Sequence, residues 1–235
     1  GAFITLRIQS EARVREIIES ASGSDEATKI SNIYASFMAA DAVNAKGCSP
    51  IAAELAEVDS ITSLKDFTST LSKLEARGLS GIFGTFIYAD MKDASTNIMY
   101  LQQGAISLPD EAYYREEKYA DIRTAFVEHV AKMFELAGVA NGSDLAAKVM
   151  ALETSIASHH WDQVKDRDAT LTYNKMDRAQ VKALMSAFDW DLYLTAGEIP
   201  AVVLDSVIVQ QPSFFEGLNS ILASFDVDAW KAWMK

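Results

Sequence analysis

The stretch YADIRTAFVEHVAKMFELAG, residues 119–138, decides the fold class. Its apolar side chains recur every three or four positions, which places them on one face of a helix. Gly138 follows as a residue suited to end that helix. The apolar face comprises Tyr119, Ile122, Phe126, Val130, Met133, Phe134 and Ala137. A helix with so wide an apolar face must pack against other elements, so the stretch predicts a mainly α-helical domain.

Helical spacing continues on both sides of this stretch. Ser24 is suited to cap a helix that ends near Gly47, and Ser63 with Asp66 resembles a capping box. Ser49 followed by Pro50 is typical of an N-cap and a first helical residue. The helices expected from these signals cover residues 3–21, 24–47, a short segment after 49, 63–78, 144–156, 178–186, 189–196, 213–224 and 227–234.

A different periodicity separates the early helices from the central one. Residues 81–90 and 96–101 are rich in β-forming side chains, and the polar residues 91–95 between them favour a turn. They predict a small β-hairpin, and residues 202–209 are a further candidate strand. Without a repeat or an evident linker, we expect one compact, mainly α domain with a β-hairpin element.

Composition narrows the possible partners and settings. The 235 residues carry a formal net charge of -12, which disfavours binding to a phosphate backbone, so we expect no nucleic acid partner. No apolar run approaches the roughly 18 to 20 residues that a membrane span needs, so we expect no membrane segment in this chain. The single cysteine, Cys48, forms no internal disulfide, which favours a cytoplasmic setting and a packing role for its side chain.

The two ends of the chain look cut. The first residues, Gly1 to Phe3, include neither Met nor a signal-like segment, and the last helix has no capping glycine. Trp230 and Trp233 lie within the last six residues and need to be buried. We therefore expect missing sequence or a partner at this end.

No catalytic or metal-binding arrangement emerges from the residue spacing. Zinc hydrolysis needs two histidines one helical turn apart beside a carboxylate, and His129, His159 and His160 offer no such pair. The neighbours His159 and His160 would point about 100° apart on a helix. A calcium loop from Asp166 would require Gly where Leu171 stands. We therefore predict no catalytic residue, no metal ligand and no cofactor in this chain.

A family becomes visible at residues 102–114, QQGAISLPDEAYY, which resemble the Gln-x-Gly-Leu-x-Leu-Pro-x-x-x-Tyr-Tyr stretch of neprilysin-type zinc metallopeptidases. Residues 90–95 are similar to the family's Asp-x-Lys-Asn-Ser turn, and residues 160–176 to its His-Trp, Arg-Asp and Tyr-Asn-x-Met string. Phe188-Asp189-Trp190 and Trp230-Lys231 continue the likeness, which covers the whole chain and is strongest to bacterial oligopeptidase-like members. Ala105-Ile106 departs from the usual Gly-Leu.

The resemblance implies a division of labour within a longer protein. The family's His-Glu-x-x-His helix, its further Glu ligand and its substrate-anchoring strand fall outside this segment, so zinc would belong to the full-length parent, a zinc metalloendopeptidase. Residues 1–235 would form the helical, non-catalytic lobe, with the catalytic lobe of the same polypeptide and oligopeptide substrates as partners. Tyr113 and Tyr114 are candidates for facing the substrate chamber, with helix packing as the alternative. The alternative function is a stand-alone helical module that binds a peptide or protein.

Overall fold

The computed structural model describes residues 1–224 and 226–235, and its backbone contacts divide the chain into two compact units, residues 1–50 and 51–235. The expectation of one domain over residues 1–235 stays a prediction beside this division. The boundary lies beside Gly47 and Pro50, in a segment that the sequence suggested was only a helix junction. Glycine and proline are common at such boundaries because neither continues a helix readily.

The first unit consists of helices α1 (Ala2–Glu19), α2 (Asp25–Met38) and α3 (Ala40–Lys46). Ser24 caps α2 as predicted, since its side chain accepts a hydrogen bond from the Ala27 N–H at 3.2 Å. The Tyr34 hydroxyl donates to Glu19 at 2.9 Å and joins α2 to the end of α1. The helix expected over 24–47 is interrupted at Ala39, whose ψ of 59° is not helical, and nothing in the local sequence explains this break.

The helices of the second unit match the predicted pattern more closely. They are α4 (Ala52–Asp59), α5 (Leu64–Ala76), α6 (Ala112–Arg115), α7 (Ala120–Leu136), α8 (Gly142–Ala157), α9 (Gln163–Asp166), α10 (Arg178–Leu184), α11 (Trp190–Ala196), α12 (Pro212–Ala223) and α13 (Val227–Met234). Ser63 caps α5 through the Asp66 N–H, but the Asp66 carboxylate reaches Thr62 instead of completing a capping box with Ser63. Ser49 and Pro50 begin a 3-10 turn, and α4 starts only at Ala52.

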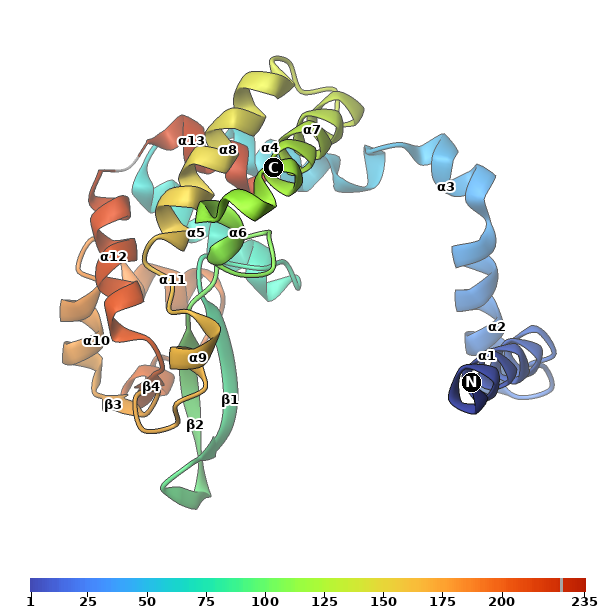
Figure 1. Ribbon diagram of the computed structural model, residues 1–235, viewed down its shortest axis with the longest axis horizontal. Helices are drawn as coiled ribbons and strands as arrows, with labels where there is room; N and C mark the ends of the chain where they lie inside the picture. The colour runs from blue at the N-terminus through green and yellow to red at the C-terminus, as the bar shows by residue number, and fades with distance from the viewer. Residues whose placement is uncertain (225) are drawn as a thin grey trace. The chain divides into compact units, whose positions relative to one another are not determined.

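A small sheet lies at one end of the second unit, and the tip of its β-hairpin extends beyond the helices (Figure 1). Its strands are β1 (Gly84–Asp90), β2 (Asp93–Gln102), β3 (Asn174–Met176) and β4 (Val207–Val209), in the order β1-β2-β4-β3. The predicted hairpin is confirmed, with a tighter turn than expected, while β4 joins β2 in parallel and pairs antiparallel with β3. Of the candidate strand 202–209 only the last three residues are extended, because residues 201–204 form a 3-10 turn after Pro200. The three-residue β3 was not predicted.

A buried carboxylate fastens the hairpin tip to β3. Asp90, 1% exposed, accepts hydrogen bonds from Lys175 Nζ at 2.8 Å, the Tyr173 hydroxyl at 2.8 Å and the Lys92 N–H at 2.9 Å. These donors lower the pKa of Asp90 to about 2, with Lys175 contributing most. The Lys92 ammonium lies 4.1 Å from the centre of the Tyr173 ring. The turn thus depends on an ionised aspartate.

The core of the second unit is aromatic and lies between the sheet and the helices. Phe83, just before β1, has ring centres of Phe188, Trp190 and Tyr193 within 5.7 Å. Trp230 packs against Phe67 of α5 with centres 4.9 Å apart and is 1% exposed. Helix α5 thus buries Trp230, while Trp233 is half-buried. Each such ring contributes roughly 2 to 3 kcal/mol through the apolar area removed from water.

Candidate functional site

The loop between β2 and α6, residues 103–111, borders three cavities. These have volumes of about 340, 460 and 490 Å³, and Ile106 lines all three. The 103–111 loop is also the segment that carried the family resemblance. Since loops held by a rigid scaffold commonly carry binding functions, we take this loop as the candidate site.

Two glutamines hold the beginning of the loop. The Gln103 side-chain amide donates to the Trp161 carbonyl at 3.1 Å and accepts from the Trp161 N–H at 2.8 Å, which imitates one step of strand pairing. The Gln103 N–H donates to Gln211 Oε1 at 2.9 Å, and the Gln211 amide donates in turn to Asp166. The amides connect the loop to the segment after α8 and to the start of α12. They position the backbone and contain no acid or base.

His160 also contacts the beginning of the 103–111 loop. Its Nε2 lies 2.8 Å from the Gly104 carbonyl, and its ring meets Phe214 edge-on with centres 4.9 Å apart. Burial lowers the pKa of His160, so the ring is neutral near pH 7, and a carbonyl partner requires the proton on Nε2. His159 instead packs against Gly217, where a Cβ would lie 2.2 Å from the His159 ring. The two rings have different partners, and His129 is exposed on α7.

A buried glutamate fixes the middle of the loop to α8. Glu153, 1% exposed, accepts from the Ser107 N–H at 3.0 Å, the Ser107 hydroxyl at 2.7 Å and the Tyr114 hydroxyl at 2.5 Å. The Tyr114 hydroxyl accepts from the Leu108 N–H at 3.0 Å. Burial, followed by the hydrogen bond to Glu153, raises the pKa of Tyr114. This network satisfies a charge that would otherwise be costly inside the protein.

Ala105 holds the loop in a strained conformation. Its φ is +64°, in the left-handed region that costs a side chain with a Cβ roughly 1 to 2 kcal/mol. Gly is usual at this position in the resembling family, so the departure noted in the sequence falls on the residue whose conformation favours glycine. The loop thus keeps this shape at an energetic cost that its hydrogen bonds offset.

The two predicted chamber residues lie in α6, directly after the loop. Tyr114 is buried and its hydroxyl belongs to the Glu153 network. Tyr113 is half-buried and stacks on Tyr119 with ring centres 4.0 Å apart, while its carbonyl accepts from Arg123 at 2.8 Å. Both contacts are of the packing kind, and their orientation toward a chamber stays a prediction.

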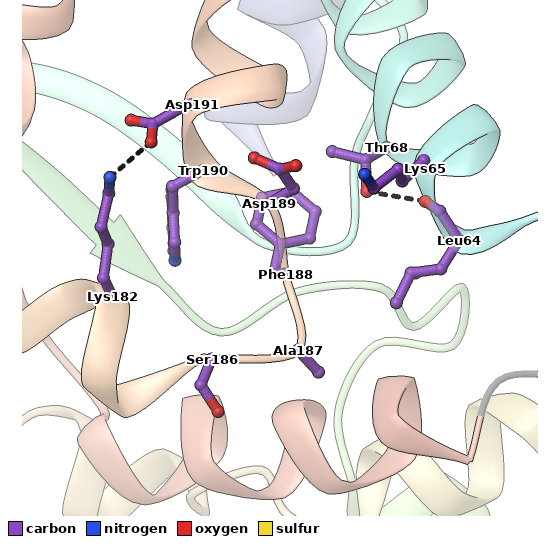
Figure 2. A pocket seen from close by; sticks show the side chains of 10 residues that line it. All are labelled: Leu64, Lys65, Thr68, Lys182, Ser186, Ala187, Phe188, Asp189, Trp190 and Asp191. Atoms are coloured by element: carbon purple, nitrogen blue, oxygen red, sulfur yellow. Dashed lines mark hydrogen bonds and ion pairs between the residues drawn. The ribbon is translucent and has the colours of Figure 1, made fainter.

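Figure 2 shows a further cavity, of about 540 Å³, between the start of α5 and the loop before α11. Lys182 and Asp191 form an ion pair across its rim at 2.6 Å, and the Asp189 carboxylate caps α11 through the Leu192 N–H. The buried Trp190 indole N–H donates to no residue that the structure describes. Both aspartates are already engaged in contacts that stabilise the fold, so we prefer the 103–111 loop as the candidate site.

Within residues 1–224 and 226–235, no three His, Cys, Asp or Glu side chains lie close enough together to hold a metal ion. None of the helices there is long and apolar enough to cross a membrane.

Comparison with known proteins decides the family. The amino-terminal model of Peptidase family M13 matches residues 1–235. The chain belongs to peptidase family M13. Within that family, the M13 chain is 23% identical to endothelin-converting enzyme 1 of Rattus norvegicus over 241 residues, which cover 96% of this chain and 32% of that enzyme.

Solved structures agree with this membership. The M13 chain superposes on the Mycobacterium tuberculosis zinc metalloprotease Zmp1 in complex with inhibitor with a TM-score of 0.91 and 35% identity, over 99% of this chain and 37% of that one. Zmp1 in its open state gives a TM-score of 0.89 at 35% identity, over 100% and 38%. The chain therefore spans about a third of the length of the relatives it matches. It is the amino-terminal domain of a zinc metallopeptidase family, as the resemblance predicted.

Sequence reasoning missed the residues that shape the site. Glu153 stands four residues after Val149 and three before Ile156, on the apolar face of α8, and a charged residue at such a position is a signal of a buried polar network. Gln103 and Gln211 gave no comparable signal, since their pairing joins segments over 100 residues apart.

Proposed function

We propose that this M13 chain is the substrate-admitting, non-catalytic lobe of a zinc metalloendopeptidase, which packs against the catalytic region of the same polypeptide and lets oligopeptides reach it while excluding folded proteins. The observation that carries the proposal is the match of the M13 amino-terminal model to all of residues 1–235, in a chain about a third as long as its relatives. The zinc and the hydrolytic residues then belong to the remaining part.

Exposed apolar side chains support a partner within the same polypeptide. In the first unit, none of the helices α1, α2 and α3 buries a residue. Phe3 is 89% exposed, Ile33 71% and Phe37 82%. A covering surface for such side chains is expected, because apolar patches on proteins commonly mark interaction sites.

A lobe that controls access to an active site needs a rigid wall and a part that can move to open the chamber. The 103–111 loop is fixed by the hydrogen bond that Gln103 donates to Trp161, by the contact of His160 with the Gly104 carbonyl, and by the hydrogen bonds that Glu153 accepts from Ser107. The solved relative Zmp1 is described in an open state, in a partial open state and in complex with an inhibitor. We propose an analogous opening for this protein, with Tyr113 better placed than the engaged Tyr114 to face a substrate. We also propose a cytoplasmic setting, as the single Cys48 allows no internal disulfide.

The test uses the longer polypeptide that contains this chain. A peptide of about ten residues and a stable folded protein carrying the same ten residues in an exposed loop are compared as substrates. The proposal predicts efficient cleavage of the free peptide alone, and loss of this selectivity when residues 1–235 are deleted. A graded series of longer unstructured peptides serves as a second measurement, with kcat/KM expected to fall with length. Equal cleavage of peptide and folded protein by the intact polypeptide would overturn the proposal.

A further inference from the structure

A half-buried glutamate lies at a cavity beside the 103–111 loop. Glu75, in the last turn of α5, lines the cavity of about 490 Å³ together with residues from 78–85 and 102–106. Its carboxylate lies over Gly81, where a Cβ would come 1.3 Å from Oε1. A side chain at position 81 would therefore require the Glu75 carboxylate to move.

The carboxylate has an unused acceptor. Glu75 Oε2 is enclosed and accepts no hydrogen bond from any residue that the structure describes. None of the cavity-lining residues is Lys, Arg or His, and Glu75 is the charged residue among them. The other polar side chains of the lining are Ser80, Thr85, Gln102 and Gln103. An enclosed carboxylate oxygen normally has a hydrogen-bond partner, so Oε2 lacks the partner that such an atom usually has.

The cavity therefore has the chemistry of a site for a cationic donor. A guanidinium or ammonium group carries N–H donors and one positive charge, which match one carboxylate with a free oxygen. A calcium ion would need six to eight oxygen ligands, and a single carboxylate among mostly apolar and glycine residues does not supply them. The neighbouring cavity of about 460 Å³ shares Leu79 and Ile106 with this one and adds the apolar side chains of Leu71, Leu74 and Trp233.

We propose that Glu75 binds the guanidinium or ammonium group of a peptide in this cavity, with the apolar neighbouring cavity receiving an adjacent side chain. The inference rests on the proposed function for its view that peptides are the ligands. It adds a chemical preference that the family membership does not contain. The site requires no group transfer and no metal ion.

Burial raises the pKa of Glu75 to about 7, while hydrogen bonding with Tyr193 of α11 acts to lower it. Tyr193 is the titratable group facing Glu75, since the lining from 78–85 and 102–106 contains none. A cation binds the ionised form, whose fraction rises about tenfold between pH 6 and pH 8 for a pKa near 7. Affinity for a guanidinium is therefore expected to rise by up to about tenfold over that range.

The test is isothermal titration calorimetry on the full 235-residue chain with acetyl-Ala-Arg-Ala-amide as the probe. The neutral isostere acetyl-Ala-citrulline-Ala-amide is expected to bind at least about tenfold more weakly. Glu75→Gln should remove this preference and the pH dependence, while Glu128→Gln, which removes one exposed charge on α7, should change neither. Whether the bound cation is the terminal ammonium group of a peptide is tested by comparing the binding of Ala-Ala-Ala-amide with that of its acetylated form.

The outcomes are separable. Equal binding of arginine and citrulline peptides, or an arginine preference that survives in Glu75→Gln, would overturn the inference. If Glu75→Gln does not fold, the pKa of Glu75 in the unchanged chain, followed by carboxyl NMR, must fall when the arginine probe saturates the site; an unchanged pKa would equally overturn it. The size-selectivity test in the longer polypeptide does not depend on Glu75. The proposed access control and the proposed Glu75 site can therefore fail independently.

Discussion

Replacing Glu153 by Gln tests whether α8 holds the 103–111 loop. The carboxylate accepts three hydrogen bonds, two from Ser107 and one from Tyr114. A glutamine keeps the size, but it is neutral, and its N–H₂ end can only donate, which at best reverses the hydrogen bond with the Ser107 hydroxyl. Each hydrogen bond to a charged acceptor, worth about 1.5 to 3 kcal/mol, becomes a neutral one worth about 0.5 to 1.5 kcal/mol. We expect a loss of roughly 2 to 4 kcal/mol in the free energy of unfolding.

The assay is thermal and urea unfolding followed by circular dichroism. For a chain of this size each kcal/mol lowers Tm by roughly 2 to 4 °C, so Glu153→Gln is expected to lower Tm by about 5 to 15 °C. Glu128→Gln is the matched control and should change stability by less than about 0.5 kcal/mol, as an exposed substitution. A double-mutant cycle with Tyr114→Phe should give a coupling of about 1 kcal/mol or more. Stability within about 0.5 kcal/mol of the unchanged chain in Glu153→Gln would refute the reasoning.

Three further outcomes follow from backbone strain and from titrating groups. Ala105→Gly should raise the free energy of unfolding by about 1 kcal/mol, because φ is +64° there. The control Ala151→Gly, inside α8, should lower it by about 0.5 to 1 kcal/mol. If urea titrations give a change of the same sign for both variants, the strain argument is contradicted. The pKa of Asp90 is lowered to about 2, so ionised Asp90 stabilises the fold above its ordinary pKa near 4, and this stabilisation is lost as pH falls toward 2. The difference in unfolding free energy between the unchanged chain and Asp90→Asn should therefore shrink on acidification. A difference that stays constant from pH 6 to pH 2 would count against this reasoning. The pKa of Glu75 is raised to about 7, so the free energy of unfolding should fall by up to roughly 3 kcal/mol as pH rises from 5 to 8. Glu75→Gln should flatten this pH dependence in thermal melts. An equally steep dependence in the variant would refute the assignment to Glu75.

The sequence was most informative where structure is local. The apolar face over 119–138 predicted α7, and the β-rich stretches around residues 91–95 predicted the β1–β2 hairpin. Both depend on neighbours in the chain, either through helical spacing or through a turn. The short β3 was missed because its pairing with β4 joins segments that are distant in the chain, and the break at Ala39 has no signal in the local sequence.

The candidate site could be predicted only in part. The family resemblance pointed to residues 102–114, and the strained residue is the one that departs from the family pattern, Ala105. The partners that hold this loop come from distant parts of the chain, as in the pairs Gln103 with Gln211 and Ser107 with Glu153. Such pairings depend on how α8 and α12 pack, which residue spacing alone does not reveal.

On the function proposed above, this chain is the non-catalytic part of a zinc peptidase. The most direct measurement is hydrolysis of a mixture of unstructured oligopeptides by the purified 235-residue chain, with and without a zinc chelator, together with its zinc content after dialysis. The account predicts no chelator-sensitive cleavage and no stoichiometric zinc. Cleavage that the chelator abolishes, with one zinc ion per chain, would contradict it.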